Sequence, residues 1–324
     1  MLTRRLFPFA PFAPFALAAV AALSAAAACS SSERPDFDGE DSGIAPGSDA
    51  SIGPAVDSGP GFTGDSGTSG RTGPAEVFVH SNDTLYKLDP NSAALELSKV
   101  GKFSGVTGSM VDIALNEDGE MYGTTYDGVY RIDKTTGAAT LIRAGATDAR
   151  EYPDSLSFVP KGTLEADREV LVGYRGSDYI RIDPQSGAIE VVKRNALGRY
   201  LVSSGDIVSI REGDFLTYLT VKPNFDEECA DDAECRKCQD NDCLFEVNPS
   251  TGEKISNLGS TKRASVFGLA FWAGTVYGIN SEGKLFKIAT DSPPSVTNVT
   301  IPGGLGAIKF FGAGSSTAAP VGPN

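Results

Sequence analysis

The sequence contains little of the material from which catalytic and metal sites are usually built. Its 324 residues include five cysteines, one histidine (His80) and one tryptophan (Trp272). A Ser-His-Asp triad would have to use His80, and no nucleophile motif lies near this residue. We therefore expect His80 to be structural, and we assign no residue to catalysis.

Basic residues are also few. The 28 lysines and arginines stand against 42 acidic residues, which gives a formal net charge of −14. Nucleic acids and anionic membrane surfaces repel such a chain, so we expect neither as a partner. No long hydrophobic run follows the N-terminal one, and we expect no transmembrane helix in the mature protein.

The N-terminus has the layout of an export signal. Arg4 and Arg5 precede an apolar stretch, Leu6–Ala28, and small residues stand directly before Cys29. This arrangement resembles the bacterial lipobox, whose cysteine is lipid-modified. The resemblance implies a signal peptide at residues 1–28 and a lipid anchor at Cys29, in the bacterial outer membrane or at the cell surface. Ala26 stands where the lipobox most often has leucine, so plain secretion is the alternative.

Two terminal segments have compositions typical of disorder. Residues 29–74 are rich in Ser, Gly, Pro and Asp and contain almost no bulky apolar side chain. Such a segment buries too little surface to offset the entropy of ordering it. We expect a disordered acidic tether at residues 29–74 and a disordered tail at residues 315–324.

Between these segments one pattern of four short strands is repeated. In Val111–Ile142 apolar and polar side chains alternate in four runs, separated by turn residues such as Asp-Gly and Thr-Gly. The third run of the pattern recurs at Leu85–Pro90, Val129–Lys134, Tyr179–Pro184, Leu244–Pro249 and Leu285–Ala289. Repeats of about 40–50 residues with four strands each are typical of β-propellers.

The sequence therefore predicts an all-β propeller of four-stranded blades at residues 75–314. Five blades are favoured. The first repeat begins at Glu76 without an innermost strand, and we expect the C-terminal run Ala307–Phe311 to pair into it and close the ring. Six blades are the alternative, because Arg199–Lys222 and Cys243–Leu258 could belong to two units.

The Asp-Pro-x-Ser/Thr-Gly turns, as in Asp183–Gly187, resemble those of secreted quinoprotein-like and YVTN-like propeller repeat proteins. The resemblance covers about residues 75–312 and implies the fold, because these families include enzymes, binders and scaffolds. A tryptophan-docking repeat is missing, which argues against the enzymes that bind pyrroloquinoline quinone.

Resemblance to the fold class places functional groups around the central channel, on the face where successive blades are connected. Asp112, Asp154 and Asp206 are predicted to begin innermost strands near that channel mouth. They could hold Ca²⁺, the one cofactor we consider, or could cap their own turns. The connecting loops carry side chains that suit a sugar or an anionic ligand, or that are simply exposed charges: Arg150, Tyr152, Arg199, Tyr200, Lys262 and Arg263.

One insertion interrupts the repeat between the second and third strands of the fourth unit. It spans residues 226–243 and carries Cys229, Cys235, Cys238 and Cys243. In an exported chain, four such cysteines indicate two disulfides, with zinc ligation as the alternative. Spacing leaves all three connectivities open. By strand order the loop stands on the face of the channel mouth, as a rim or a partner contact.

These features favour a surface-anchored, monomeric, non-enzymatic module that binds a protein or a glycan. A structural envelope component is the first alternative. The second is a channel-mouth enzyme, either a glycoside hydrolase or a Ca²⁺-dependent lactonase or lyase. Catalysis would need two of the three acids to converge, with the pKa of one raised by the other.

Overall fold

The computed structural model describes residues 75–92, 95–146, 149–211, 216–229, 232–301 and 308–322. All of them belong to one compact unit of the chain. The predicted signal peptide, the lipidation site Cys29 and the tether lie outside the described residues. Within the described part, no helix is both long enough and apolar enough to span a bilayer.

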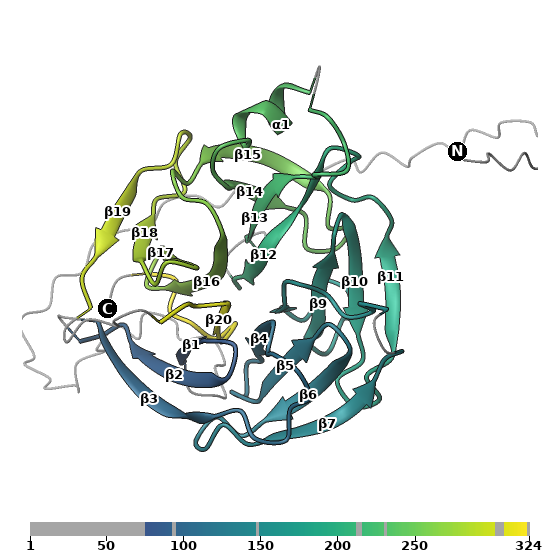
Figure 1. Ribbon diagram of the computed structural model, residues 1–324, viewed down its shortest axis with the longest axis vertical. Helices are drawn as coiled ribbons and strands as arrows, with labels where there is room; N and C mark the ends of the chain where they lie inside the picture. The colour runs from purple at the N-terminus through teal and green to yellow at the C-terminus, as the bar shows by residue number, and fades with distance from the viewer. Residues whose placement is uncertain are drawn as a thin grey trace, which may run out of the picture. The chain divides into compact units, whose positions relative to one another are not determined.

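Five four-stranded antiparallel sheets form the blades of a propeller (Figure 1). Blade 1 contains, from the axis outward, β20 (Gly312–Ser315), β1 (Val77–His80), β2 (Thr84–Asp89) and β3 (Glu96–Lys102). Blade 2 contains β4 (Asp112–Leu115), β5 (Met121–Thr125), β6 (Gly128–Ile132) and β7 (Ala139–Ala144). Blade 3 contains β8 (Ser157–Val159), β9 (Val170–Arg175), β10 (Asp178–Ile182) and β11 (Ile189–Lys193).

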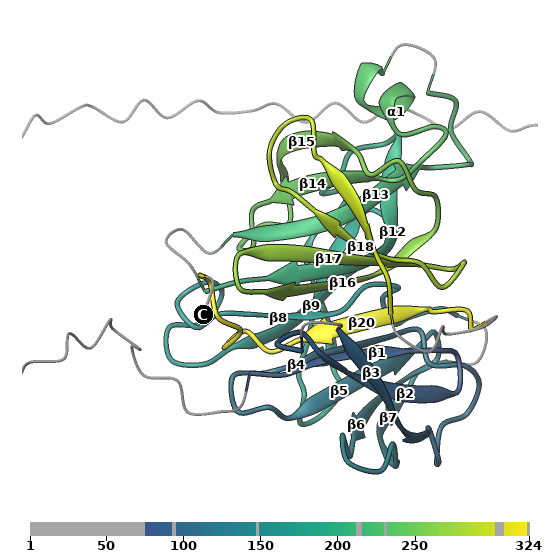
Figure 2. The same cartoon turned by 90° about the vertical axis from the view of Figure 1, so that its left-hand side faces the viewer.

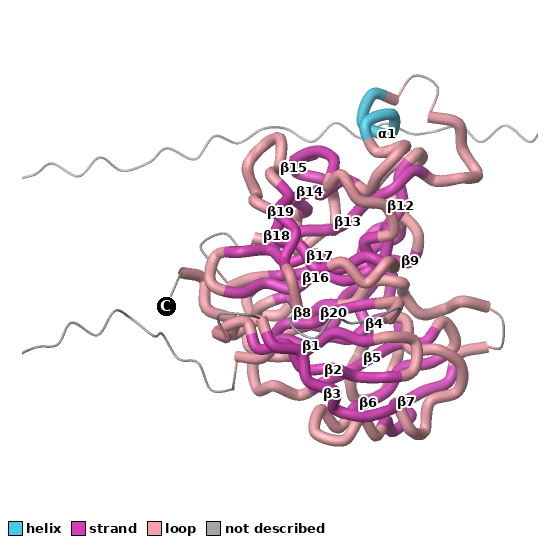
Figure 3. The backbone as a smooth tube through the Cα atoms, turned by 60° about the vertical axis from the view of Figure 1, so that its left-hand side comes forward, coloured by secondary structure: helices cyan, strands magenta, loops and turns pink. Residues whose placement is uncertain are grey.

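The last two blades complete the ring. Blade 4 contains β12 (Leu201–Ser209), β13 (Thr217–Pro223), β14 (Cys243–Val247) and β15 (Lys254–Ser260). Blade 5 contains β16 (Val266–Trp272), β17 (Thr275–Asn280), β18 (Leu285–Ile288) and β19 (Val296–Val299). One helix, α1 (Ala233–Lys237), is found among the described residues and stands out from the strands in Figure 3.

The predicted five-bladed propeller is thus confirmed. All five repeats singled out in the sequence fall on the third strand of their blade. The six-blade alternative is wrong, because β13 pairs with β14 through Tyr218↔Glu246 to Val221↔Cys243 within one sheet.

The repeated turn sequence is explained by its hydrogen bonds. In blade 3 the Asp183 carboxylate accepts from the backbone N–H groups of Gln185 (2.8 Å) and Ser186 (3.1 Å). Gly187 then donates its N–H to the carbonyl of Asp183, with a φ of 68° that favours glycine. The same turn in blade 4 packs against blade 3, where the Tyr179 hydroxyl donates to the carbonyl of Pro249 (2.8 Å).

The ring closes as expected, but through a different strand. The closing strand is Gly312–Ser315, paired antiparallel with β1, rather than Ala307–Phe311. The alternation of apolar side chains in Ala307–Phe311 is typical of a strand, which explains the wrong prediction. The innermost position instead requires small residues, because a Cβ at Gly312 would lie 2.3 Å from His80 Nε2 and one at Gly314 would lie 2.8 Å from the Ile113 carbonyl.

The boundary predicted at residue 314 falls inside this closing strand, and the described residues beyond it are packed. Ser316, Thr317, Ala318 and Ala319 are all buried. The Ser316 hydroxyl donates to the Asn116 carbonyl (3.0 Å), and the Pro320 carbonyl accepts from the Ala273 N–H (2.7 Å). The small residues that suggested a disordered tail instead fit between blades 2 and 5. Figure 2 shows that the chain ends on the side away from α1.

Candidate functional site

The face that carries α1 holds the loops between successive blades and the loops between second and third strands. We call the inner part of this face, around the ends of β4, β12 and β16, the channel mouth. Acidic side chains from three blades lie in this part of the ring. Asp154 and Asp206 do not begin innermost strands as expected, because β8 begins only at Ser157 and β12 already begins at Leu201. The acidic side chains form two groups that differ in burial and in hydrogen bonding.

Asp112 and Asp206 form the first group, which we call the acid pair. Asp112 begins β4, whereas Asp206 lies in the middle of β12, and both side chains are fully buried. Asp112 accepts from the backbone N–H groups of Ile113 (2.8 Å) and Leu156 (2.6 Å). Asp206 accepts from the N–H groups of Ile207 (2.6 Å) and Leu269. Each carboxyl group therefore connects its own strand to the chain of the following blade.

The two carboxyl groups of the acid pair also influence each other's ionisation. Burial and the neighbouring Asp206 raise the pKa of Asp112 well above its usual range, and burial likewise raises that of Asp206. Two buried carboxylates close to each other repel, which favours the protonated form of one of them. The pKa values belong to the pair rather than to either residue.

His80 lies beside this pair. Its Nδ1 is 2.7 Å from the Ser81 carbonyl, which makes Nδ1 the protonated nitrogen, and its buried Nε2 has no hydrogen-bond partner. Burial lowers the pKa of His80 to about 4, so the ring is neutral at pH 7. A Cβ at Gly312 would meet both His80 Nε2 and Asp112 Oδ1, at 2.3 and 2.4 Å. The closing strand β20 therefore passes directly over both side chains.

Asp154, in the loop before β8, belongs to the second group. It is partly exposed, but its Oδ1 is buried without a hydrogen-bond partner, as is the fully buried Ser203 Oγ of β12. Burial raises the pKa of Asp154 to about 7, and the charges of Lys222 and Arg150 and the nearby Ser203 hydroxyl partly oppose this rise. Ser203 thus faces Asp154 without meeting the geometry of a hydrogen bond.

Asp242 is the second loop acid. One of its oxygens, Oδ2, accepts from the Ser204 hydroxyl (2.5 Å) and from the Val266 N–H (2.7 Å). Burial raises the pKa of Asp242, while Ser204, the Val266 N–H and the charge of Lys222 lower it. The positive charge of Lys222 therefore lowers the pKa of both Asp154 and Asp242. Within the described residues, the lysine has no ion pair or hydrogen bond of its own.

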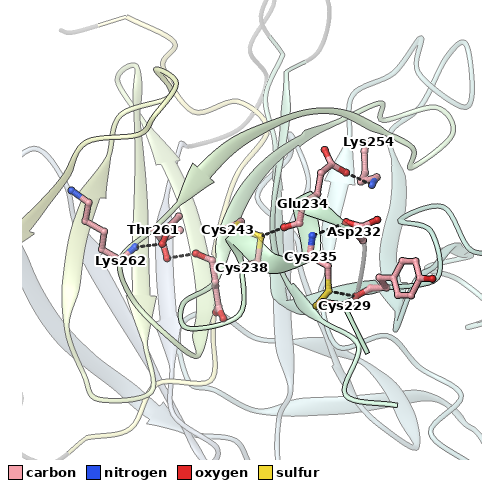
Figure 4. The surroundings of a disulfide bond; sticks show 12 residues. Cys229, Asp232, Glu234, Cys235, Cys238, Cys243, Lys254, Thr261 and Lys262 are labelled. Carbon is pink, nitrogen blue, oxygen red and sulfur yellow. Dashed lines mark hydrogen bonds and ion pairs between the residues drawn. A yellow bond between two sulfur atoms is a disulfide. The ribbon is translucent and has the colours of Figure 1, made fainter. Parts of the chain in front are cut away.

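The insertion leads directly into β14, and Figure 4 shows the surroundings of its disulfides. Its two predicted disulfides are present and join Cys229 to Cys235 and Cys238 to Cys243. Asp232 caps α1 by accepting from the Cys235 N–H (2.7 Å). Lys254 of β15 and Glu234 form an ion pair at 2.5 Å that holds the helix on blade 4. The described part of the insertion is therefore cross-linked and tied to blade 4, and we call it the rim.

A cavity of about 170 Å³ lies between this rim and the strands beneath it. Its wall includes Asp242 of the second group, together with Ser204 and Lys222. Phe225, directly before the insertion, is 86% exposed at this cavity. Phe267 of β16 contributes a second aromatic ring, which stacks on Phe311 with centroids 6.2 Å apart.

The other side chains expected at this face have more ordinary roles. Tyr152 is buried, and its hydroxyl donates to the Gly187 carbonyl (3.0 Å). The Arg150 guanidinium lies over the Tyr126 ring, 4.2 Å from its centroid. Arg199 is paired with Glu227 at 2.8 Å and lies beside the ring of Tyr200. Lys262 and Arg263 stand in the connecting loop before β16 and do not line the cavity.

Sequence reasoning missed Lys222, Phe225, Asp242 and Phe267. Lys222 and Phe267 look like ordinary strand residues, and only the folded chain brings them next to the insertion. Phe225 and Asp242 flank the cysteines, so the insertion itself was the available signal. Within the described residues, no group of three or more His, Cys, Asp or Glu side chains is placed to hold a metal ion.

No protein-family model and no curated protein matches this sequence. Similar solved structures have low sequence identity to this chain and low TM-scores. A protein of a nidogen/laminin complex has a TM-score of 0.41 and 10% identity, over 76% of this chain and 100% of its own. The aldose sugar dehydrogenase of Streptomyces coelicolor in its PQQ-bound form has a TM-score of 0.41 and 15% identity, over 74% and 80%. A Bacteroides caccae protein of unknown function has a TM-score of 0.39 and 11% identity, over 75% and 98%. The propeller assignment stands on the five sheets themselves.

Proposed function

We propose that the chain is an exported, lipid-anchored binding module whose site is the rim of the channel mouth beside the insertion. Its ligand is a protein or a glycan of the cell envelope. The observation that carries the proposal is Phe225, 86% exposed next to a loop held by two disulfides. Large exposed aromatic side chains on a rigid support are typical of interaction sites. The disulfides also support an oxidising, exported location.

The acid pair favours a second candidate, a hydrolase acting at the channel. Two neighbouring carboxyl groups with raised pKa values can divide the roles of acid and base. Against this candidate stands the burial of both side chains, which leaves a substrate no access. Backbone N–H groups from two blades already bond to each of these carboxyl groups. We therefore rank binding above catalysis, with a purely structural envelope role between them.

The binding proposal is tested by capture from an envelope extract on the immobilised full-length chain. The Phe225→Ala variant removes the exposed ring. Ile255→Ala, at a 58% exposed position on β15 of the same blade, is the matched control. We expect wild type and Ile255→Ala to retain the same material and Phe225→Ala to lose it. Equal capture by all three, or capture by none, would contradict the proposal.

Treatment of the extract identifies the class of ligand. Periodate cleaves vicinal diols and so destroys most glycans, whereas a protease removes protein partners. Capture that is abolished by periodate and survives protease identifies a glycan, and the reverse result identifies a protein.

The anchor is tested separately. Cells expressing the full chain are labelled with a palmitate analogue and fractionated, with Cys29→Ala as the variant. We expect label and membrane association in the wild type and neither in the variant. A soluble, unlabelled wild-type protein would point to plain secretion.

A further inference from the structure

The cavity beside the insertion combines charges of both signs with aromatic surface. Lys222 is its cation, and within the described residues this side chain has no ion pair or hydrogen bond. Asp242 accepts from Ser204 and Val266 through Oδ2, and it lines the cavity beside Lys222. The cavity therefore offers an ammonium donor next to a carboxylate acceptor.

The rim adds further donors, acceptors and rings. Gln239 and Asn241, from the end of the insertion, also line the cavity, and an amide both donates and accepts. Phe225 and Phe267 supply apolar faces beside these polar groups. A ligand matched to this wall needs hydroxyl groups that donate and accept, together with an apolar face that can lie against an aromatic ring.

Other ligand classes fit this wall less well. An anion such as phosphate would meet Asp242 and the neighbouring Asp240, and a chain of net charge −14 repels polyanions. A cationic ligand would meet Lys222. A peptide or a drug-sized molecule needs roughly 300–1,000 Å³, well above the 170 Å³ of this cavity.

We propose that this cavity holds one neutral sugar ring, with Lys222 and Asp242 on its hydroxyl groups and Phe225 against its apolar face. The ring is the end unit of a glycan whose remaining units extend into solvent. This inference rests on the proposed binding function and names the ligand class of the same site. No bond is made or broken, so the site recognises the sugar without altering it.

The test uses the full-length protein and free monosaccharides as probes. D-glucose, D-galactose, D-mannose and N-acetylglucosamine are titrated while ligand resonances are followed by saturation-transfer NMR, which detects weak binding. Lys222→Met keeps the apolar stem and removes the ammonium group. Asp242→Asn keeps an acceptor for the Val266 N–H. Lys262→Met, an exposed position on the same face outside the cavity, is the matched control.

We expect at least one of these sugars to bind the wild type. Phe225→Ala and Lys222→Met should each weaken that binding by roughly tenfold or more, and Lys262→Met should leave it unchanged. The inference is overturned if none of the four sugars gives a saturation-transfer signal with the wild type. It is also overturned if Lys222→Met and Lys262→Met bind a sugar equally well. If an envelope protein is nevertheless captured through Phe225, the binding function stands and only the sugar assignment fails.

Discussion

The two groups of acids at the channel mouth are of the same residue type but differ in what their oxygens do. In the acid pair, Asp112 and Asp206 lie within strands, are fully buried and accept backbone N–H groups from two blades each. Asp154 and Asp242 lie in loops and share Lys222 as a neighbouring charge, and the Oδ1 of Asp154 has no hydrogen-bond partner in the described chain. Acceptors that hold backbone N–H groups of two blades stabilise the ring, whereas Asp242 also lines a cavity that a ligand can enter.

The largest expected effect comes from breaking the acid pair. Asp112→Ala leaves the N–H groups of Ile113 and Leu156 without their acceptor and removes the carboxyl group that neighbours Asp206. Each unsatisfied buried group costs about 1–3 kcal/mol, so we expect a loss of roughly 3–5 kcal/mol in the free energy of unfolding. Urea unfolding of the full chain measures this loss. Asp154→Ala is the control, with an effect of about 1 kcal/mol or less. Equal losses would erase the distinction between the two groups.

His80 makes the same buried region sensitive to acid. Its pKa is about 4 in the folded chain, against an ordinary value of 6.5 that the unfolded chain keeps. The unfolded chain therefore binds more protons between these two values. Stability contributed by the neutral ring is present above pH 6.5 and is lost as pH falls towards 4. The loss is on the order of 3 kcal/mol.

A non-titrating variant isolates this contribution. His80→Asn keeps a donor for the Ser81 carbonyl, and the difference between its free energy of unfolding and that of the wild type should change between pH 7.5 and 4.5. Acid-pair contributions largely cancel in this difference. A difference that is independent of pH would mean that His80 is already accessible to protons in the folded ring.

The titration of Asp154 should change the free energy of unfolding less than that of His80 does, and in the opposite direction with pH. Its pKa is raised to about 7, so the folded chain binds the extra proton, and stability falls as pH rises from about 4 through 7. After allowance for its partial exposure, we expect about 2 kcal/mol. Asp154→Asn should therefore gain stability over the wild type between pH 5 and pH 8, measured by urea unfolding. A constant difference would show that Lys222 and Arg150 fully offset its burial.

The sequence predicted the ring well because each repeat carries its own local signals. Alternating side chains place the strands, and the turn from Asp183 to Gly187 forms from its own carboxylate and a glycine at positive φ. The closing strand was misplaced because Gly312 and Gly314 carry no alternation. Their positions are fixed by contact with His80 and Ile113 from other strands of the ring.

The site was predicted only in part for a related reason. Strand order placed Asp112 at the start of an innermost strand, where the structure has it, but it misplaced Asp154, which precedes β8, and Asp206, which lies within β12. Whether a carboxylate oxygen already accepts a hydrogen bond depends on distant N–H groups. Those of Leu156 and Leu269 lie more than 40 residues after Asp112 and Asp206 in the sequence. Lys222 meets Asp242 only because the insertion folds back over β13.

The smallest expected effect on the fold comes from the disulfide between Cys229 and Cys235, and it completes the contrast between ring and rim. Replacing both cysteines by alanine releases a loop of six residues, worth about 2 kcal/mol of chain entropy, and this loss is confined to the insertion. We expect the urea midpoint of the propeller to change little, the insertion to become sensitive to protease, and ligand capture to fall as it does in Phe225→Ala. A drop in the midpoint comparable to that of Asp112→Ala would instead make the insertion part of the structural ring. The cysteines pack in the same hydrophobic cluster as Leu201 and Phe245, so the alanine pair is compared with Cys229→Ala alone to separate lost packing from lost cross-linking.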